Sequence, residues 1–454
     1  MKVFERIIKD KLLALTHDLL DSRQHGFLEH KSCTTNMVLF CDSLALSLNE
    51  NIVNHVIYFD FAKAFDSVNH DILLQKLKNS YGIDSILLKF LTNYLKDRSQ
   101  RVVIGSESSS TLPVNSGVPQ GSILGPLLFV LFINDLPSEL SEGTDVVLYA
   151  DDTKIWRKIM TSSDCVILQN DIDRLLDCAI RNKMKFHSSK CKVLSISSRP
   201  NPPDPPFSYN LGSTRLNFVD NEKDLGVNIT PKLTWNLQCD RIYSKACQQL
   251  GMVRRNGHIV TDLKSRRALY LSLVRSQFEN CSIIWRPTTI TLTNKLESLQ
   301  KRAIKWILFE ENLSYSPDQY ISKCKAVNIL PLSLKFDLND LLFFKKVLND
   351  LVPVPLPPYL SFYQGNSRLR SCHLDSLSLV CSIIPRSSQS SIRSTNSLTK
   401  SFFYRSHILW NNLPFETRVI SCPSLFRSSV EKFLWSSILN SDPETSLNNS
   451  YPFF

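Results

Sequence analysis

The spacing of apolar residues changes along the first sixty positions, and each period predicts a different element. Over residues 1–20, charged and apolar residues alternate so that Phe4, Ile7, Ile8 and Leu12 would share one face of a helix. A second helical pattern covers residues 34–49. Residues 56–61 then form a continuous apolar run interrupted by one acid, which is typical of a buried strand.

Helical and strand patterns continue to alternate to about residue 197. The pattern through Leu127, Phe129 and Leu131 is apolar on nearly every side, which predicts a buried helix. The remaining predicted helices cover 71–81, 84–95 and 163–185, and the predicted strands cover 101–104, 146–149, 153–156 and 192–197.

The second half of the chain begins with a proline-rich connector at 199–206, which cannot be a helix or a central strand. Residues 225–229 resemble a strand, and residues 236–350 follow a helical pattern. Within that region an apolar stripe steps by three or four positions, which predicts a buried helix face: Tyr270, Val274, Phe278, Cys281 and Trp285. The prolines at 353–358 mark another boundary, and the serine-rich residues 387–401 predict a loop.

Charge narrows the choice of partner. The chain of 454 residues has 53 lysines and arginines against 42 acidic residues. Residues 231–310 alone contain 14 basic and 5 acidic residues, so the excess is concentrated in one region, as in a face that binds a polyanion. On composition alone, a basic protein without such a partner fits equally well.

The twelve cysteines are scattered, without a C-x-x-C pair and without a secretory signal before them. This usage favours reduced thiols in an intracellular protein of the cytoplasm or the nucleus. No apolar run approaches the roughly 20 residues that span a membrane, so we expect no membrane partner.

Asp151 and Asp152 lie between two predicted strands and therefore at a hairpin turn. Adjacent carboxylates repel each other, and a divalent cation such as Mg²⁺ relieves the repulsion. An isolated pair would more often be a solvated turn, because aspartate is common in turns.

Asp60 changes that balance because it lies in an apolar run, where an unpaired carboxylate is costly. A metal ion shared by Asp60, Asp151 and Asp152 would satisfy all three. The alternative is that Asp60 ends its strand and caps the turn at 62–65.

The loop at 116–122, Ser-Gly-Val-Pro-Gln-Gly-Ser, allows close approach of a ligand to its backbone but is a weak signal by itself.

Three segments resemble, in order and spacing, motifs A, B and C of the reverse transcriptases of jockey-like non-LTR retrotransposons: Phe59-Asp-Phe-Ala-Lys-Ala-Phe-Asp66, Ser116-Gly-Val-Pro-Gln-Gly-Ser-Ile-Leu-Gly-Pro126 and Tyr149-Ala-Asp-Asp152. Residues 24–27 with 32–34 resemble the fingers motif before A, residues 183–186 with 190–192 resemble motif D, and residues 225–227 resemble motif E. The similarity covers residues 1–310 and continues weakly to 410–414.

The resemblance implies a role for individual residues. Asp60, Asp151 and Asp152 would hold two Mg²⁺ ions, for which Mn²⁺ can substitute, and Lys190 would protonate the leaving pyrophosphate. Phe61 would offer its carbonyl, Phe65 would exclude a ribose 2′-hydroxyl, and Gln120 and Gly121 would contact the incoming nucleotide. Leu225 and Gly226 would form the primer grip.

The resemblance also implies an α+β fold of the right-hand polymerase type, with an antiparallel-sheet palm. It divides the chain into partial fingers (1–52), palm (53–198), linker and primer-grip strands (199–235), a helical thumb-like region (236–350) and a C-terminal region without an assigned role (351–454). The implied partners are an RNA template, a DNA primer and deoxynucleoside triphosphates. The resemblance predicts no oligomeric state.

The chain departs from the family at its start. It lacks the fingers strand that family members have ahead of the first matched segment, and an endonuclease domain, so we expect a truncated copy. An alternative function is therefore an inactive nucleic-acid-binding remnant. A polymerase that makes RNA is disfavoured by Phe65.

Overall fold

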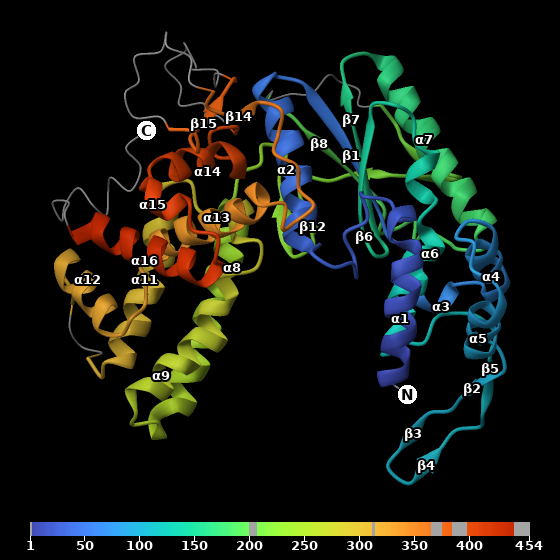
Figure 1. Cartoon of the computed structure of the whole chain (residues 1–454), viewed down its shortest axis with the longest axis horizontal. Coiled ribbons are helices and arrows are strands. Elements are labelled where there is room, and N and C mark those ends of the chain that lie inside the picture. The colour runs from blue at the N-terminus through green and yellow to red at the C-terminus, as the bar shows by residue number, and fades with distance from the viewer. Residues whose placement is uncertain (1, 199–206, 311–313, 365–374, 384–396, 440–454) are drawn as a thin grey trace. The chain divides into compact units, whose positions relative to one another are not determined.

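The computed structural model describes residues 2–198, 207–310, 314–364, 375–383 and 397–439 (Figure 1). The chain forms two compact units. The first comprises Met1–Asn36 and Glu50–Asp220, and the second comprises Met37–Asn49 and Asn221–Phe454. The proline-rich connector predicted at 199–206 lies outside the described residues, as does most of the loop predicted at 387–401.

The first unit is built on a five-stranded sheet in the order β11-β8-β1-β7-β6. Its strands are β1 (Val53–Phe59), β6 (Thr144–Tyr149), β7 (Asp152–Ile159), β8 (Lys192–Ile196) and β11 (Asn217–Phe218). β1 is the central strand and pairs antiparallel with β7 on one side and with β8 on the other. Neighbouring strands pair with both of its edges, and its side chains are buried on both faces except that of Tyr58, which is partly buried; this explains the apolar run at 56–59.

Helices supply the rest of the core of this unit. They are α1 (Lys2–Thr16), the start of α2 (Cys33–Asn49), α3 (Ala64–Ser67), α4 (His70–Asn79), α5 (Ser85–Leu95), α6 (Leu124–Ile133) and α7 (Ser162–Arg181). In α6 every residue except Pro126 is buried, as its all-round apolar pattern predicts. α7 begins with a capping box in which Thr161 and Asp164 satisfy each other's free backbone N–H groups, and it ends at residue 181 instead of the predicted 185. One short pair, β9 (Asn210–Leu211) with β10 (Thr214–Arg215), and the arm described next complete the strands that the structure describes in this unit.

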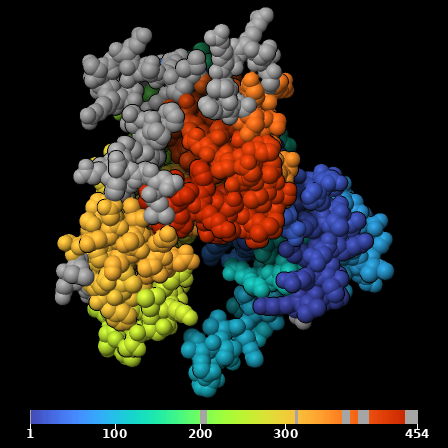
Figure 2. All heavy atoms as spheres, turned by 60° about the vertical axis from the view of Figure 1, so that its left-hand side comes forward, coloured from blue at the N-terminus to red at the C-terminus, as the bar shows by residue number. Residues whose placement is uncertain are grey.

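The strand predicted at 101–104 belongs to a longer two-stranded arm. β2 (Arg98–Gln100) pairs with β5 (Leu112–Val114), and β3 (Val103–Ile104) pairs with β4 (Glu107–Ser108). The arm projects from the unit as the blue-green extension at the bottom of Figure 2. The side chain of Ile104 is 76% exposed, so the apolar character of this segment is not explained by burial within its own unit.

The second unit is mainly helical. Besides the rest of α2, its helices are α8 (Asn236–Asn256), α9 (Leu263–Leu269), α10 (Ser282–Trp285), α11 (Ile290–Ile307), α12 (Pro317–Ala326), α13 (Leu332–Leu348), α14 (Phe402–Asn411), α15 (Phe415–Arg418) and α16 (Pro423–Leu439). The hairpins β12 (Glu222–Asp224) with β13 (Val227–Ile229), and β14 (Leu360–Phe362) with β15 (Leu379–Cys381), complete it. Together the two units confirm the predicted mixture of helices and sheet, an α+β fold.

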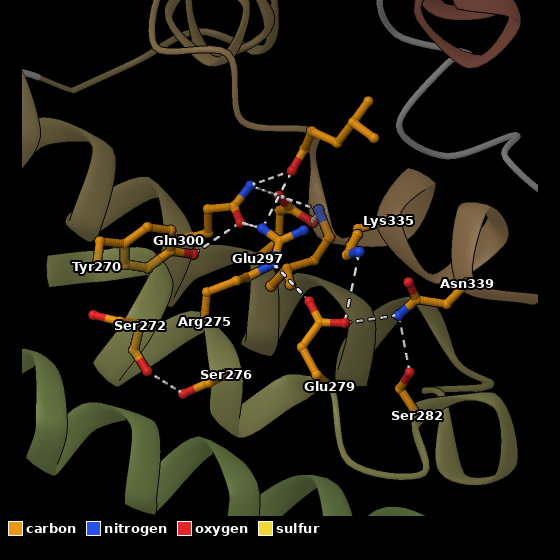
Figure 3. Close-up of polar contacts among 12 residues, drawn as sticks. Tyr270, Ser272, Arg275, Ser276, Glu279, Ser282, Glu297, Gln300, Lys335 and Asn339 are labelled. Carbon is orange, nitrogen blue, oxygen red and sulfur yellow. Dashed lines mark hydrogen bonds and ion pairs between the residues drawn. The ribbon is translucent and has the colours of Figure 1, made fainter. Parts of the chain in front are cut away.

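The apolar stripe predicted between 270 and 285 is buried along its whole length. It does not lie on one regular helix, because a π-helical turn (Tyr270–Val274) and a 3-10 turn (Arg275–Phe278) connect α9 toward α10. The change of helix type lets Arg275 point inward among the helices, where it donates to the side chain of Gln300 (Figure 3).

The predicted basic face at 231–310 needs a correction, because part of its charge is structural. Arg266, Arg275 and Arg286 are buried. Arg286 lies between two carboxylates of α13, with Nη1 at 2.8 Å from Asp337 Oδ1 and 2.7 Å from Asp340 Oδ2. A buried arginine needs such partners, so these three cations belong to the interior of the helical packing and not to a surface that meets a polyanion.

Candidate active site

Asp60 is delivered by the central strand of the sheet. The strand ends at Phe59, so Asp60 follows it and does not lie within it as the apolar pattern predicted. The backbone holds this point firmly, because His187 N donates to the carbonyl oxygen of Asp60 at 2.7 Å and Ala62 N donates to that of Lys185 at 2.8 Å. Asp60 therefore stands directly after the central strand, where its side chain can meet groups from neighbouring segments.

Asp151 and Asp152 occupy a tight turn at the same edge. Tyr149 pairs with Asp152, which leaves Ala150 and Asp151 as a two-residue connection between β6 and β7. Ala150 has a φ of 56°, in the left-handed region that an L-residue enters at a cost of about 1–2 kcal/mol. The β1–β7 ladder ends with Phe59 opposite Thr153, so Asp60 and Asp152 both directly adjoin its last pair.

The charges at this edge interact. Burial, and secondarily the neighbouring carboxylate of Asp60, raise the pKa of Asp151 above its ordinary value. Lys190 Nζ lies 2.9 Å from Asp60 Oδ2 in an ion pair. This same oxygen is buried and makes no hydrogen bond of acceptable geometry. Folding thus brings Asp60, Asp151 and Lys190 together from three distant parts of the sequence.

The donor set fits a hard divalent cation in part. Two carboxylates lie near each other, and one of their oxygens, Asp60 Oδ2, is buried with the Lys190 ammonium as its partner, a cation that a bound metal ion would replace. Asp152 is exposed beside them. Within the described ranges, no three side chains of histidine, cysteine, aspartate or glutamate form a group that could hold a metal ion. The oxygen ligands present are those that Mg²⁺ and Mn²⁺ prefer.

The loop at 116–122 is anchored to the chain that follows Asp60. Ser116 Oγ donates to the backbone oxygen of Asp66 at 2.9 Å, and Gln120 Nε2 donates to Asp66 Oδ1 at 2.8 Å. Gly117 is required here, because a Cβ on it would lie 2.8 Å from Asp66 Cα. Gly121 has a φ of 78° and nothing within 4 Å of its missing Cβ, so its backbone is open to a ligand.

The two phenylalanines of the first motif differ in their surroundings. Phe61 is buried and stacks on Phe186 with ring centroids 4.3 Å apart, so only its backbone can face the site. Phe65 is half-buried. Its ring stacks on Phe129 at 4.6 Å and meets Phe27 edge to face at 5.9 Å.

Leu225 and Gly226 belong to the second unit, unlike the other predicted site residues. They form the turn between β12 and β13, whereas the sequence predicted that Leu225 begins a strand. Both have positive φ, 45° for Leu225 and 88° for Gly226, as a two-residue hairpin of this type requires. Gln238 Nε2 donates to the carbonyl oxygen of Gly226 at 3.1 Å and fixes the turn to α8.

Comparison with known proteins identifies the family. A profile described as reverse transcriptase (RNA-dependent DNA polymerase) matches residues 1–252, more than half of the chain. This chain belongs to the reverse transcriptase family.

Its relatives are polymerases of mobile elements. The probable RNA-directed DNA polymerase from transposon BS of Drosophila melanogaster is 26% identical over 330 residues, which cover 67% of this chain and 35% of the relative. The RNA-directed DNA polymerase from mobile element jockey of Drosophila melanogaster is 28% identical over 250 residues, 52% of this chain and 26% of the relative. The predicted resemblance to non-LTR retrotransposon reverse transcriptases is thereby confirmed, and this reverse transcriptase spans about a third or less of the length of these relatives.

Solved structures with some similarity include the apo telomerase from Candida tropicalis, with 10% sequence identity over 74% of this reverse transcriptase and 54% of the telomerase chain, and a TM-score of 0.38. Within the ranges that the structure describes, no helix of this reverse transcriptase is both long and apolar enough to cross a membrane.

Sequence reasoning missed how the turn of this reverse transcriptase is supported. Residues 24–27 matched a fingers motif, but no role followed from the match. In the structure Gln24 is buried beneath Ala150, and Gly26 lies against the same backbone. The only signal in the sequence was a glycine two residues after a glutamine, which does not reveal a partner 126 residues away.

Proposed function

We propose that this reverse transcriptase copies RNA into DNA by transferring nucleotides to the 3′-hydroxyl of a primer. The observation that carries the proposal is the proximity of Asp60 and Asp151 at one edge of the sheet, where burial and the Asp60 carboxylate raise the pKa of Asp151 and Lys190 Nζ lies 2.9 Å from Asp60 Oδ2. Two carboxylates that face each other are unfavourable unless a cation joins them, and nucleotidyl transfer needs divalent cations at this type of site.

Asp60, Asp151 and Asp152 are the residues that would hold two Mg²⁺ ions. When bound, such ions lower the pKa of the primer hydroxyl and stabilise the negative charge that develops on the phosphates. The contribution of the chain is positional: the central strand and its bonds to residues 185–187 fix Asp60, and the tight turn presents Asp151 to it.

Lys190 would supply the proton for the pyrophosphate. Its ammonium group holds a proton at Nζ and its side chain is 60% exposed, so it can turn from Asp60 toward a phosphate.

The nucleotide itself would lie between Phe65 and the loop at 116–122. The ring of Phe65 is supported from behind by Phe129, which makes it a firm barrier to a 2′-hydroxyl. Asp66 holds the Gln120 side chain, and the open backbone at Gly121 permits close approach.

We further propose the right-hand arrangement for this chain. Residues 1–52 would be fingers, 53–198 the palm and 236–350 the thumb, with Leu225 and Gly226 as the primer grip. The thumb would contact the phosphates of the template and primer through the exposed cations of α8, which are Arg241, Lys245, Arg254 and Arg255. An RNA template, a DNA primer and deoxynucleoside triphosphates are the partners that this chemistry requires.

Primer extension on poly(rA)/oligo(dT) with dTTP and Mg²⁺ tests the proposal. We expect incorporation that is lost on chelation and in Asp151→Asn, which keeps the size of the side chain and removes its charge. Asp173→Asn is the matched control, because Asp173 is an exposed residue of α7 and is expected to be dispensable. Salt-sensitive binding of the hybrid by the wild-type protein without any incorporation would overturn the proposal in favour of an inactive nucleic-acid-binding remnant.

A further inference from the structure

The turn that carries Asp151 is held by hydrogen bonds to one buried side chain, that of Gln24. Gln24 is 2% exposed, and its Oε1 accepts two backbone hydrogen bonds, from Ala150 N at 2.9 Å and from Gly26 N at 2.7 Å. Its Nε2 lies 3.4 Å from the carbonyl oxygen of Ala150, to which it donates. The two N–H donors determine the orientation of the amide, because a flipped amide would present its own donors to them.

The segment around Gln24 also extends the sheet. Gln24 forms a parallel bridge with Leu148 in β6, the last strand of the sheet order. His25 N donates to the carbonyl oxygen of Leu148 at 2.8 Å, and Leu148 N donates to that of Arg23 at 3.0 Å. These backbone hydrogen bonds fix the position of Gln24 relative to the turn independently of the contacts of its side chain.

Gly26 makes the approach possible. A Cβ on Gly26 would lie 2.2 Å from Ala150 N, a distance at which the backbone would have to move. The φ of Gly26 is not in the left-handed region, so closeness and not conformational freedom requires a glycine here. The contact is therefore built into the backbone of both segments.

The backbone conformation of the turn explains why it needs the hydrogen bonds of Gln24. Ala150 holds a left-handed φ that a free alanine seldom adopts, and its N–H is buried in a two-residue connection without a ladder partner. Gln24 supplies the missing acceptor. A strained conformation persists where the surroundings over-determine it, and such places cluster at functional sites.

We infer that Gln24 is a positioning residue that holds Ala150 in its left-handed conformation and thereby directs the Asp151 carboxylate toward Asp60. This inference rests on the proposed function for its consequence in catalysis, but the grip itself is a property of the folded chain. A small displacement of a metal-binding carboxylate lowers turnover steeply, so loss of the grip reduces the rate more than it reduces substrate binding.

The test uses Gln24→Met, which keeps the approximate length of the side chain and removes the acceptor. Amide hydrogen exchange is expected to accelerate at least about tenfold at residues 26 and 150. Mn²⁺ binding, followed by electron paramagnetic resonance, is expected to weaken about tenfold, and kcat for dTTP to fall on the order of 10-fold to 100-fold while KM changes little. Adding Ala150→Gly to Gln24→Met should restore much of the Mn²⁺ affinity, because glycine adopts positive φ without strain.

Gln300→Met is the matched control. Gln300 is also fully buried and also accepts hydrogen bonds, from Tyr270 and Arg275 (Figure 3), but it belongs to the second unit. It should lower the melting temperature without accelerating exchange at residues 26 and 150. If Gln24→Met folds too poorly to assay, Gln24→Glu retains an acceptor oxygen for both N–H groups and is expected to keep their protection.

The outcomes separate the two proposals. Exchange and Mn²⁺ binding in Gln24→Met that match those of Gln300→Met would overturn the role of Gln24. A wild-type protein that binds no Mn²⁺ and extends no primer would overturn the proposed function, and exchange at residues 26 and 150 would still decide whether Gln24 holds the turn.

Discussion

Gly26 and Ala150 lie so close that the backbone nitrogen of Ala150 occupies the space in which a side chain on residue 26 would begin. The distance from a Cβ built on Gly26 to Ala150 N is 2.2 Å. The residues are far apart in the sequence, and the second one precedes a candidate metal ligand. Their contact makes the geometry of the candidate active site sensitive to a single methyl group at a distant position.

Gly26→Ala is therefore expected to lower both the stability and the activity of the protein strongly. The added methyl group meets backbone that cannot rotate away, and overpacking of this kind costs about 1–3 kcal/mol in the free energy of unfolding. Urea unfolding measures that cost, and primer extension measures the loss of activity, which we expect to exceed tenfold. Gly251→Ala in α8 is the control, since a helical glycine with only a flexible arginine near its missing Cβ should tolerate or gain from the change. Equal effects of the two substitutions would contradict the close contact.

Lys190→Met should separate catalysis from metal binding. The ammonium group of Lys190 competes with a cation for Asp60, so its removal is expected to leave Mn²⁺ binding unchanged or tighter. At the same time kcat should fall by roughly 100-fold, because a proton donor is lost. Lys190→Arg should not restore the rate, since a guanidinium does not release its proton. Lys185→Met removes an equal charge from an exposed position of the same loop and serves as the control. A lower rate with weaker Mn²⁺ binding would instead assign Lys190 a structural role.

Phe65→Val is expected to relax the choice of sugar. The shorter side chain no longer reaches the position of a 2′-hydroxyl, so the ratio of kcat/KM for UTP to that for dTTP should rise on the order of 10-fold or more. Loss of the stacking on Phe129 should cost about 1 kcal/mol in stability. Incorporation kinetics with each triphosphate measure the ratio. An unchanged ratio in a folded, active variant would show that Phe65 is only part of the hydrophobic core.

Asp42→Asn should change how the stability of the protein depends on pH. Burial raises the pKa of Asp42 from 3.8 to about 6, while the hydroxyl of Tyr359 donates to its Oδ1 at 2.7 Å. Because the pKa is higher in the folded state, this carboxyl favours folding below pH 4, and that contribution is lost as the pH rises through 6. At about 1.4 kcal/mol for each pKa unit, the shift from 3.8 to about 6 corresponds to a total loss of about 3 kcal/mol, which is nearly complete by pH 7.

Asparagine keeps an acceptor for Tyr359 and has no charge to bury. The variant should therefore be more stable than the wild type at pH 7.5 and similar to it at pH 4.5, as measured by urea unfolding at the two values. A variant that is less stable than the wild type at pH 7.5 would show that Asp42 is held as a carboxylate by its surroundings.

Local sequence patterns predicted elements well where burial surrounds an element. The apolar run that became β1 and the all-round apolar helix α6 were recognisable because each is enclosed by its own unit. The patterns were less reliable where the chain turns. Leu225 was assigned to a strand but lies in a turn, since its left-handed φ is imposed by the pairing of its neighbours and leucine does not signal it.

Which charged residues are exposed was the property that the sequence predicted least well. The basic excess at 231–310 suggested one binding face, yet Arg275 and Arg286 are turned into the helical unit by partners on other helices. Neither the count nor the spacing of cations reveals whether a carboxylate from a distant helix reaches them. The ion pair between Lys190 and Asp60 was equally hidden, because the two residues meet only when their segments pair beside the central strand.

By itself the sequence determined most of the longer helices and strands up to about residue 197, the identity of the family, and the candidates Asp60, Asp151 and Asp152, because side-chain periodicity and motif spacing are local properties of the chain. Tertiary structure alone decided that Asp60 and Asp151 converge while Asp152 remains exposed beside them, and that Gln24 and Gly26 support the turn. The physical reason is that hydrogen bonds and steric exclusion between distant segments depend on strand register, and register is set by the packing of the whole unit.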